Sequence, residues 1–95
     1  RIATLPVGYA DGLPRAAGMG RAHLYAGGQL RPTAGPVCMD GCMIDVTGLR
    51  VNVGDPVEIF GDHAAIEDLA SATDTIPYEI LCRIPQRVRR RHLRT

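Results

Sequence analysis

The chain has 95 residues, an apolar fraction of 45% and a formal net charge of +1 at pH 7, which indicates one small globular domain. This charge gives it no general attraction to nucleic acid or an anionic membrane, and no apolar run approaches the roughly 18 residues of a membrane span. We therefore expect neither a nucleic-acid nor a membrane partner. Because the chain contains no lysine, chemistry that needs a lysine amine must take it from another polypeptide segment.

Further expectations concern the start of the chain, its cysteines and histidines, and the arginines near its end. The chain opens on Arg1 and an apolar run, so we expect a segment of a longer protein with no signal peptide. Its three cysteines form no C-x-x-C pair and its three histidines are scattered, so we expect no disulfide framework and no metal site. Six arginines crowd residues 83–94. We interpret them as solvated, since a nucleic-acid patch would need aromatic stacking residues.

Short apolar or β-branched runs between glycines and prolines predict strands. These runs are residues 2–7, 23–26, 29–33, 37–39, 43–46, 56–60 and, at the end of the chain, 87–93. The pair around Gly27-Gly28 has the pattern of a β-hairpin with a primed turn. Residues 8–20 are rich in glycine and lack apolar periodicity, which predicts a long loop.

Residues 65–73 contain the clearest helical pattern. Ile66, Leu69, Ala70 and Thr73 follow the i, i+3, i+4, i+7 spacing. Residues 78–82 fit a short helix or a strand equally well. The whole pattern predicts a mainly β fold, a small Greek-key-like β-barrel or sandwich with one short helix.

Tyr9 is the first candidate functional residue. It lies between Gly8 and Gly12, directly after the first predicted strand. Flanking glycines allow a sharp turn, which can project the phenol into a cleft as a proton donor or acceptor. The alternative is a tyrosine that packs at a loop tip with a local hydrogen bond. Two later segments, 37–40 and 75–79, are expected to contribute to the same site.

Taken in this order, these segments resemble the C-terminal domain of alanine racemase, a pyridoxal-phosphate enzyme that interconverts L- and D-alanine. The resemblance is carried by residues 6–15, 37–40, 42–45, 53–57, 60–61, 75–81 and 87–91. It implies that residues 1–95 are one β-domain and that an N-terminal α/β barrel outside this chain carries the cofactor on a lysine. It also implies a cytoplasmic homodimer, in which this domain covers the cofactor mouth of the other subunit's barrel. The isolated domain is expected to be inactive.

The resemblance assigns roles to individual residues. Tyr9 matches the catalytic tyrosine that acts as the base for the L-enantiomer, opposite the cofactor lysine. Met39 matches the position whose backbone N–H contacts the substrate carboxylate, and Asp40 beside it is expected to orient groups of the site. Tyr78 matches the tyrosine that donates its hydroxyl to the cofactor phosphate, and Ile76 helps it to narrow the substrate entrance. A phenol that works near neutral pH needs nearby positive charge or hydrogen-bond donors, which the sequence does not locate.

One departure and two alternatives remain open. Pro36 stands where many family members have an arginine, so an entrance charge is lost and substrate preference is left open. Residues 42–46 and 76–78 also resemble racemase domains fused to a muramoyl-peptide ligase; D-alanine would serve peptidoglycan synthesis. The alternatives are a non-catalytic β-module for oligomerisation or partner binding, and a β-barrel that binds RNA or DNA through its arginines.

Overall fold

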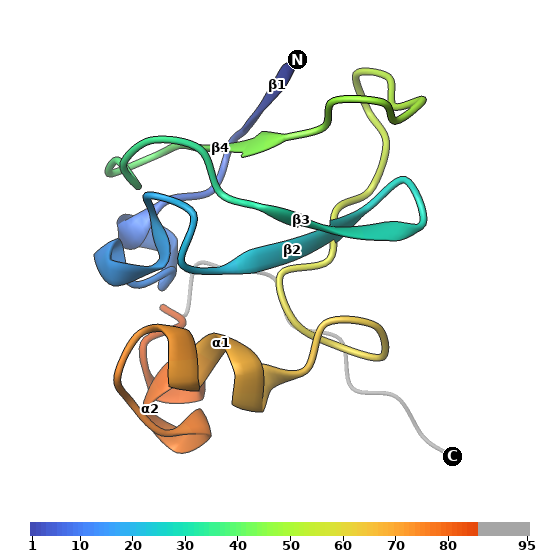
Figure 1. The fold of residues 1–95 in the computed structure, drawn as a ribbon. Coiled ribbons are helices and arrows are strands. Elements are labelled where there is room, and N and C mark those ends of the chain that lie inside the picture. Colours follow the sequence, from blue (N-terminus) through green and yellow to red (C-terminus); the bar gives the residue numbers. More distant parts are fainter. Residues whose placement is uncertain (86–95) are drawn as a thin grey trace.

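The computed structural model of the chain describes residues 1–85. Its elements in chain order are β1 (Ile2–Leu5), the 3-10 helices η1 (Tyr9–Asp11) and η2 (Arg15–Ala17), β2 (His23–Ala26), β3 (Gln29–Pro32), β4 (Cys42–Asp45), α1 (Ile66–Ala72) and α2 (Pro77–Cys82). Figure 1 shows the strands in the upper half of the molecule and the two α-helices beneath them. The closing strand predicted for residues 87–93, and the arginines within it, lie outside the described residues.

The predicted hairpin is confirmed. Strands β2 and β3 pair antiparallel, from His23 opposite Pro32 to Ala26 opposite Gln29. The two turn residues have positive backbone angles, with φ of 57° at Gly27 and 83° at Gly28. A type I′ turn requires positive φ at both positions, which is why the glycine pair fixes the register of this hairpin.

A second antiparallel pair, β1 with β4, forms the other sheet, in the register Ile2 opposite Asp45 to Leu5 opposite Cys42. Side chains in β4 alternate, with Cys42 and Ile44 buried, as expected for a strand with one face on the core. An isolated bridge from Thr33 to Ile44 joins the two sheets. Within residues 1–85 the strands form two two-stranded sheets and no closed barrel, and the mainly β prediction is confirmed.

The strand predicted for residues 37–39 is wrong. The Cys38 amide donates to the Gly41 carbonyl at 2.8 Å across a tight turn. The carbonyls of Cys38 and Met39 accept amides of η1 rather than those of a neighbouring strand. The apolar run therefore forms a loop, and pairing begins only at β4.

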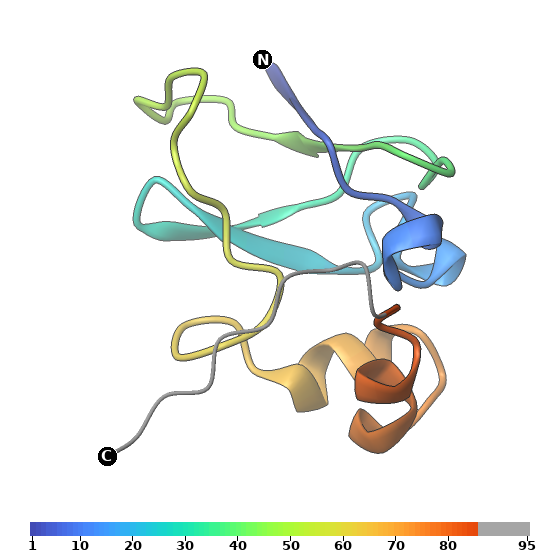
Figure 2. The ribbon, with the colours of Figure 1, turned by 180° about the vertical axis from the view of Figure 1, so that it is seen from behind.

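The strand predicted for residues 56–60 is reduced to a single bridge. Glu58 exchanges both of its backbone hydrogen bonds with Tyr25, each at 2.9 Å. Its carboxylate accepts the amides of His63 at 2.7 Å and Ala64 at 2.6 Å. These bonds turn the chain toward α1. Figure 2 shows the whole connection between β4 and α1 passing the hairpin on its way to that helix.

The helical prediction is confirmed by α1, which buries Leu69 and Ala70. The ambiguous residues 78–82 are helical and form most of α2. Pro77 occupies the first turn of this helix, a position where the missing amide costs nothing and the fixed φ is favourable. Ile80 is buried at 1% exposure, which anchors α2 to the core beside α1.

The long loop predicted for residues 8–20 is ordered by η1 and η2 and tied to the sheet by Thr33. The Thr33 hydroxyl donates to the Ala17 carbonyl at 2.7 Å and accepts the Gly20 amide at 3.0 Å. Thr33 is buried at 4% exposure, and its hydrogen bond to Ala17 is shielded from water.

We expect Thr33→Val to lower the free energy of unfolding by about 1–3 kcal/mol, since it removes both hydrogen bonds of the hydroxyl. The Gly20 amide loses its acceptor, while the Ala17 carbonyl still accepts the Ala22 amide at 3.1 Å. Urea denaturation of the chain measures this loss. Thr33→Ser keeps the hydroxyl and is the matched control, with most of the stability retained. Equal losses in the two variants would show that the methyl group, not the hydrogen bonds, holds the loop.

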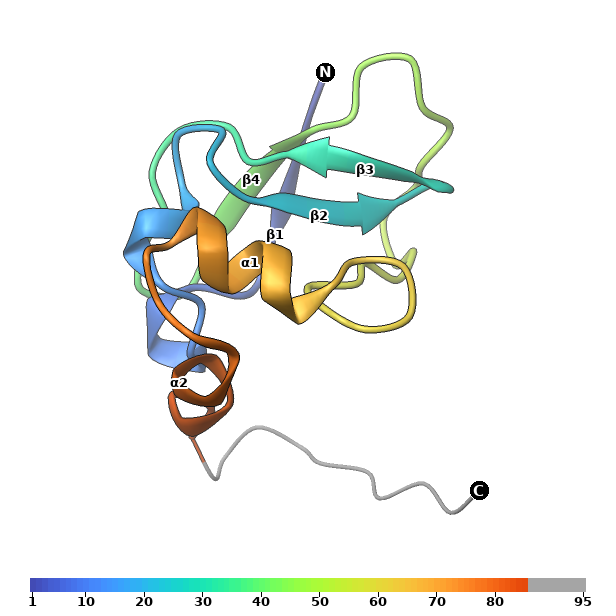
Figure 3. The same ribbon diagram turned by 60° about the horizontal axis from the view of Figure 1, so that its bottom comes forward.

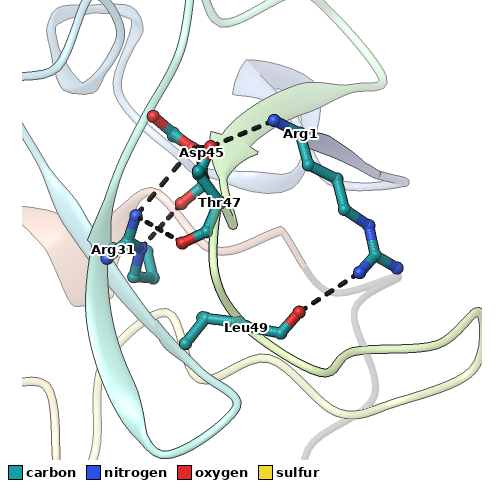
Figure 4. Close-up of polar contacts among 5 residues, drawn as sticks. All are labelled: Arg1, Arg31, Asp45, Thr47 and Leu49. Atoms are coloured by element: carbon teal, nitrogen blue, oxygen red, sulfur yellow. Dashed lines mark hydrogen bonds and ion pairs between the residues drawn. The ribbon is translucent and has the colours of Figure 1, made fainter.

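A polar cluster closes the end of β4 (Figure 4). Asp45 Oδ1 accepts the Thr47 hydroxyl at 2.6 Å and the Thr47 amide at 2.9 Å. Arg31 donates from Nε to the Asp45 carbonyl at 2.8 Å, and Arg1 donates from Nη1 to the Leu49 carbonyl at 3.2 Å. The Thr47 side-chain hydrogen bond, followed by its backbone bond, lowers the pKa of the Asp45 carboxyl.

The lowered pKa gives a pH dependence with a defined sign. A carboxyl with a folded-state pKa below its unfolded value stabilises the fold above the unfolded pKa, about 4, and this contribution is lost as pH falls through the folded pKa. We therefore expect the free energy of unfolding to fall on acidification below about pH 4. Asp45→Asn and Thr47→Val should each reduce that slope, measured by denaturant titration at several pH values. A slope that neither substitution changes would contradict the assignment.

Candidate functional site

The site begins where η1 lies on the 38–41 loop. The Tyr9 amide donates to the Cys38 carbonyl and the Ala10 amide donates to the Met39 carbonyl, each at 3.0 Å. The Asp11 carboxylate caps the turn by accepting the Gly8 amide at 3.0 Å. Two segments that are distant in the sequence are thereby joined, and the structure brings Tyr9 together with the loop that carries Met39 and Asp40.

Gly8 makes this junction possible. A Cβ added at Gly8 would collide with the Cys38 carbonyl oxygen and lie 2.5 Å from the Met39 carbonyl oxygen and 2.7 Å from the Gly41 nitrogen. All three obstacles are backbone atoms, which cannot swing aside. Only glycine lets the two backbones approach this closely, so Gly8 sets the position of the residue that follows it.

The Tyr9 side chain is presented on the surface and is 39% exposed. The guanidinium carbon of Arg15, the first residue of η2, lies 5.3 Å from the centroid of its ring. The loop therefore folds a cation over the candidate catalytic phenol. Sequence reasoning missed this contact, because no regular spacing relates two residues of an irregular loop.

Met39 and Asp40 present groups that the described residues leave available. The Met39 side chain is 54% exposed, and its carbonyl is occupied by Ala10. Within residues 1–85 its amide donates to no acceptor, and the exposed Asp40 carboxylate has no hydrogen-bond or ion-pair partner. An N–H donor and a carboxylate thus lie beside Tyr9 on one loop.

Ile76 and Tyr78 come from a different element, the start of α2. They are 62% and 73% exposed. The Glu79 carboxylate holds this turn by accepting the Thr75 hydroxyl at 2.6 Å and Arg83 Nη2 at 2.7 Å, and these hydrogen bonds lower the pKa of Glu79. Among residues 1–85, no hydrogen bond, ion pair or ring contact joins Ile76 or Tyr78 to Tyr9.

The far end of α2 nevertheless packs against the Tyr9 turn. A Cβ added at Gly12, where φ is 103°, would lie 2.9 Å from the Arg83 carbonyl oxygen. Figures 1 and 3 place η1, η2 and α2 at the same end of the molecule. Both sets of candidate residues therefore belong to one end of the domain.

An apolar cavity of about 350 Å³ lies between the Tyr9 turn and the helices. Its walls include Val7, Leu13, Phe60, Leu69, Ile80 and Ile84. None of the five candidate residues lines it. The candidate site is therefore an exposed surface of the domain, separate from this apolar pocket.

Among residues 1–85, no group of three or more His, Cys, Asp or Glu side chains could hold a metal ion. No helix in the same part of the chain is long and apolar enough to cross a bilayer.

Fold and site define the class of this protein: a small, mainly β domain that displays a tyrosine and an exposed loop at one end. Comparison with protein families makes the assignment specific, because the model of the alanine racemase C-terminal domain matches residues 1–92. The chain belongs to the alanine racemase C-terminal domain family.

Relatives and solved structures agree with this family. The chain is 48% identical over 90 residues to an alanine racemase of Deinococcus deserti, covering 94% of this chain and 25% of the relative. It superimposes with a TM-score of 0.87 and 36% identity on alanine racemase from Bartonella henselae with covalently bound pyridoxal phosphate, covering 97% of this chain and 27% of that one. Biosynthetic alanine racemase from Pseudomonas aeruginosa gives a TM-score of 0.87 and 39% identity, with 99% and 26% covered. The chain thus spans about a quarter of the length of these proteins.

Proposed function

We propose that this chain is the C-terminal domain of a pyridoxal-phosphate-dependent alanine racemase and that it contributes Tyr9 as an acid/base group. The observation that carries the proposal is the way in which the backbone around Tyr9 is held while its side chain stays accessible. Two backbone hydrogen bonds fix its turn on the 38–41 loop, while its phenol remains exposed to a partner.

Racemisation removes the α-proton from one face of the amino acid and returns a proton to the opposite face. Two acid/base groups on opposite faces are the simplest solution. Tyr9 is the base for L-alanine, and a lysine of the barrel domain serves D-alanine, since this chain has no lysine. When bound, pyridoxal phosphate spreads the negative charge that develops at the α-carbon over its ring.

The remaining candidate residues bind the substrate or the cofactor and orient groups of the site. The Met39 amide donates to the substrate carboxylate, and Asp40 orients the neighbouring groups. Tyr78 donates its hydroxyl to the cofactor phosphate, which its 73% exposure permits, and Ile76 narrows the entrance with it. Pro36 is exposed beside the loop and supplies no charge at the entrance.

The proposed assembly rests on the finding that the chain spans only about a quarter of the length of its racemase relatives. Residues 1–95 form the C-terminal domain, and an N-terminal α/β barrel carries the cofactor lysine. In a cytoplasmic homodimer, this domain covers the barrel of the other subunit and delivers Tyr9 in trans. The D-alanine formed serves peptidoglycan synthesis. Support for this arrangement comes from the exposed site and from the racemase relatives, of which the chain spans about a quarter.

The test compares the 95-residue chain with its full-length parent. With pyridoxal phosphate, the parent should abolish the optical activity of L-alanine, which polarimetry follows. The 95-residue chain alone should neither racemise alanine nor produce the absorbance band of covalently bound cofactor, because it has no lysine to bind it. A parent that leaves L-alanine unchanged, or a cofactor band from this chain alone, would reject the proposal.

A further inference from the structure

We infer that Arg15 is a positioning residue for Tyr9, which holds the phenol ring in its working orientation from within the same domain. The inference rests on the proposed function, since it concerns how Tyr9 performs that role. Its basis is the 5.3 Å distance between the Arg15 guanidinium carbon and the ring centroid. A guanidinium within about 6 Å of a tyrosine face is attracted by the quadrupole of the ring.

The backbone of Arg15 is held in place by its neighbours. Arg15 opens η2 directly after the buried Pro14. Ala17, two residues later, is 0% exposed, and its carbonyl accepts the buried Thr33 hydroxyl at 2.7 Å. The guanidinium therefore extends toward Tyr9 from a fixed base.

Among the described residues, no acid competes for the Arg15 cation. Within residues 1–85, Arg15 forms no ion pair with aspartate or glutamate, whereas Arg31 and Arg83 each pair with a carboxylate. Its ring contact is the one side-chain interaction that the described structure records for Arg15. A guanidinium without an acidic partner can remain over the phenol.

In the described part of the chain, little else fixes the orientation of the Tyr9 ring. The η1 hydrogen bonds hold the Tyr9 backbone but leave side-chain rotation free. The described residues supply no hydrogen bond to its hydroxyl. Arg15 narrows the range of ring orientations, which matters because proton transfer depends on the distance and angle between donor and acceptor.

The experiment uses the full-length parent enzyme with pyridoxal phosphate. Arg15→Gln and Arg15→Met remove the cation, and Arg15→Lys retains a positive charge. Arg21→Gln is the matched control, because Arg21 is an exposed arginine directly after the same loop with no ring contact in residues 1–85. The readouts are kcat, KM and the primary isotope effects with α-deuterated L-alanine and α-deuterated D-alanine.

We expect the neutral variants to lower kcat by about 3- to 10-fold with little change in KM. Since Tyr9 takes the proton only from L-alanine, slowing its step should raise the isotope effect for L-alanine and lower that for D-alanine. Arg15→Lys should restore part of the rate, and Arg21→Gln should match the wild type. A purely structural role would move both isotope effects together or leave them unchanged.

Thermal denaturation midpoints show which of the two neutral variants, Arg15→Gln and Arg15→Met, is folded. One folded variant is enough for the test. The inference is overturned if a folded neutral variant has wild-type kcat and isotope effects while Tyr9→Phe is inactive. If Tyr9→Phe remains active, the proposed function itself fails. The two failures are therefore distinguishable.

Discussion

Replacing Tyr9 with phenylalanine in the full-length enzyme should lower racemase kcat by about 10²- to 10⁴-fold, the usual contribution of a general acid or base. The ring and its contact with Arg15 are retained, and only the hydroxyl is lost. Because backbone hydrogen bonds hold Tyr9 in place, the fold and the proposed dimer should be unaffected. Steady-state kinetics in both directions, with size-exclusion chromatography, measures each part of this expectation.

Tyr25→Phe is the matched control. Tyr25 stacks on His63 with ring centroids 4.3 Å apart and has no place in the proposed site, so its hydroxyl should be dispensable for catalysis. If Tyr9→Phe and Tyr25→Phe were equally active, Tyr9 would have no catalytic role. The β-module alternative, in which this domain serves only oligomerisation or partner binding, would then be favoured.

The second large effect is expected at Gly8. Gly8→Ala places a methyl group among three backbone atoms of the 38–41 loop, and the loop and η1 must separate to admit it. We expect the free energy of unfolding to fall by about 3 kcal/mol or more, at the upper end of overpacking costs. Urea denaturation of the chain measures the loss of stability.

Gly41→Ala serves as the control from the same junction. A Cβ at Gly41 would meet the Leu5 carbonyl oxygen at 3.5 Å, an ordinary van der Waals distance. Its cost should stay below about 1 kcal/mol. Equal stability losses in the two variants would show that the close approach at Gly8 does not hold the site together.

Local sequence signals predicted the elements that local chemistry determines. The Gly27-Gly28 pair fixed a hairpin, because a primed turn needs two residues with positive φ. The apolar spacing from Ile66 through Thr73 indicated α1, because one face of a helix must be buried. The resemblance located Tyr9, Met39 and Asp40, and the structure places all three at one junction.

Local sequence patterns did not predict the contacts between segments that are distant in the sequence. Residues 37–39 have an apolar composition that suits a strand, yet the carbonyls of Cys38 and Met39 accept hydrogen bonds from amides of η1. Residues 56–60 were also predicted as a strand, but the Glu58 carboxylate folds the chain away after one bridge. The contact between Arg15 and Tyr9 depends on the path of an irregular loop, which neither periodicity nor propensity encodes.

Hydrogen exchange at the α-carbon tests the central claim most directly. The full-length Tyr9→Phe variant, with pyridoxal phosphate in D₂O, is given L-alanine or D-alanine, and NMR follows the loss of the α-proton. If the phenol acts as the base only for L-alanine, the variant should exchange the α-proton of D-alanine without racemising it. The α-proton of L-alanine should not exchange. Exchange of L-alanine at the wild-type rate would contradict the account.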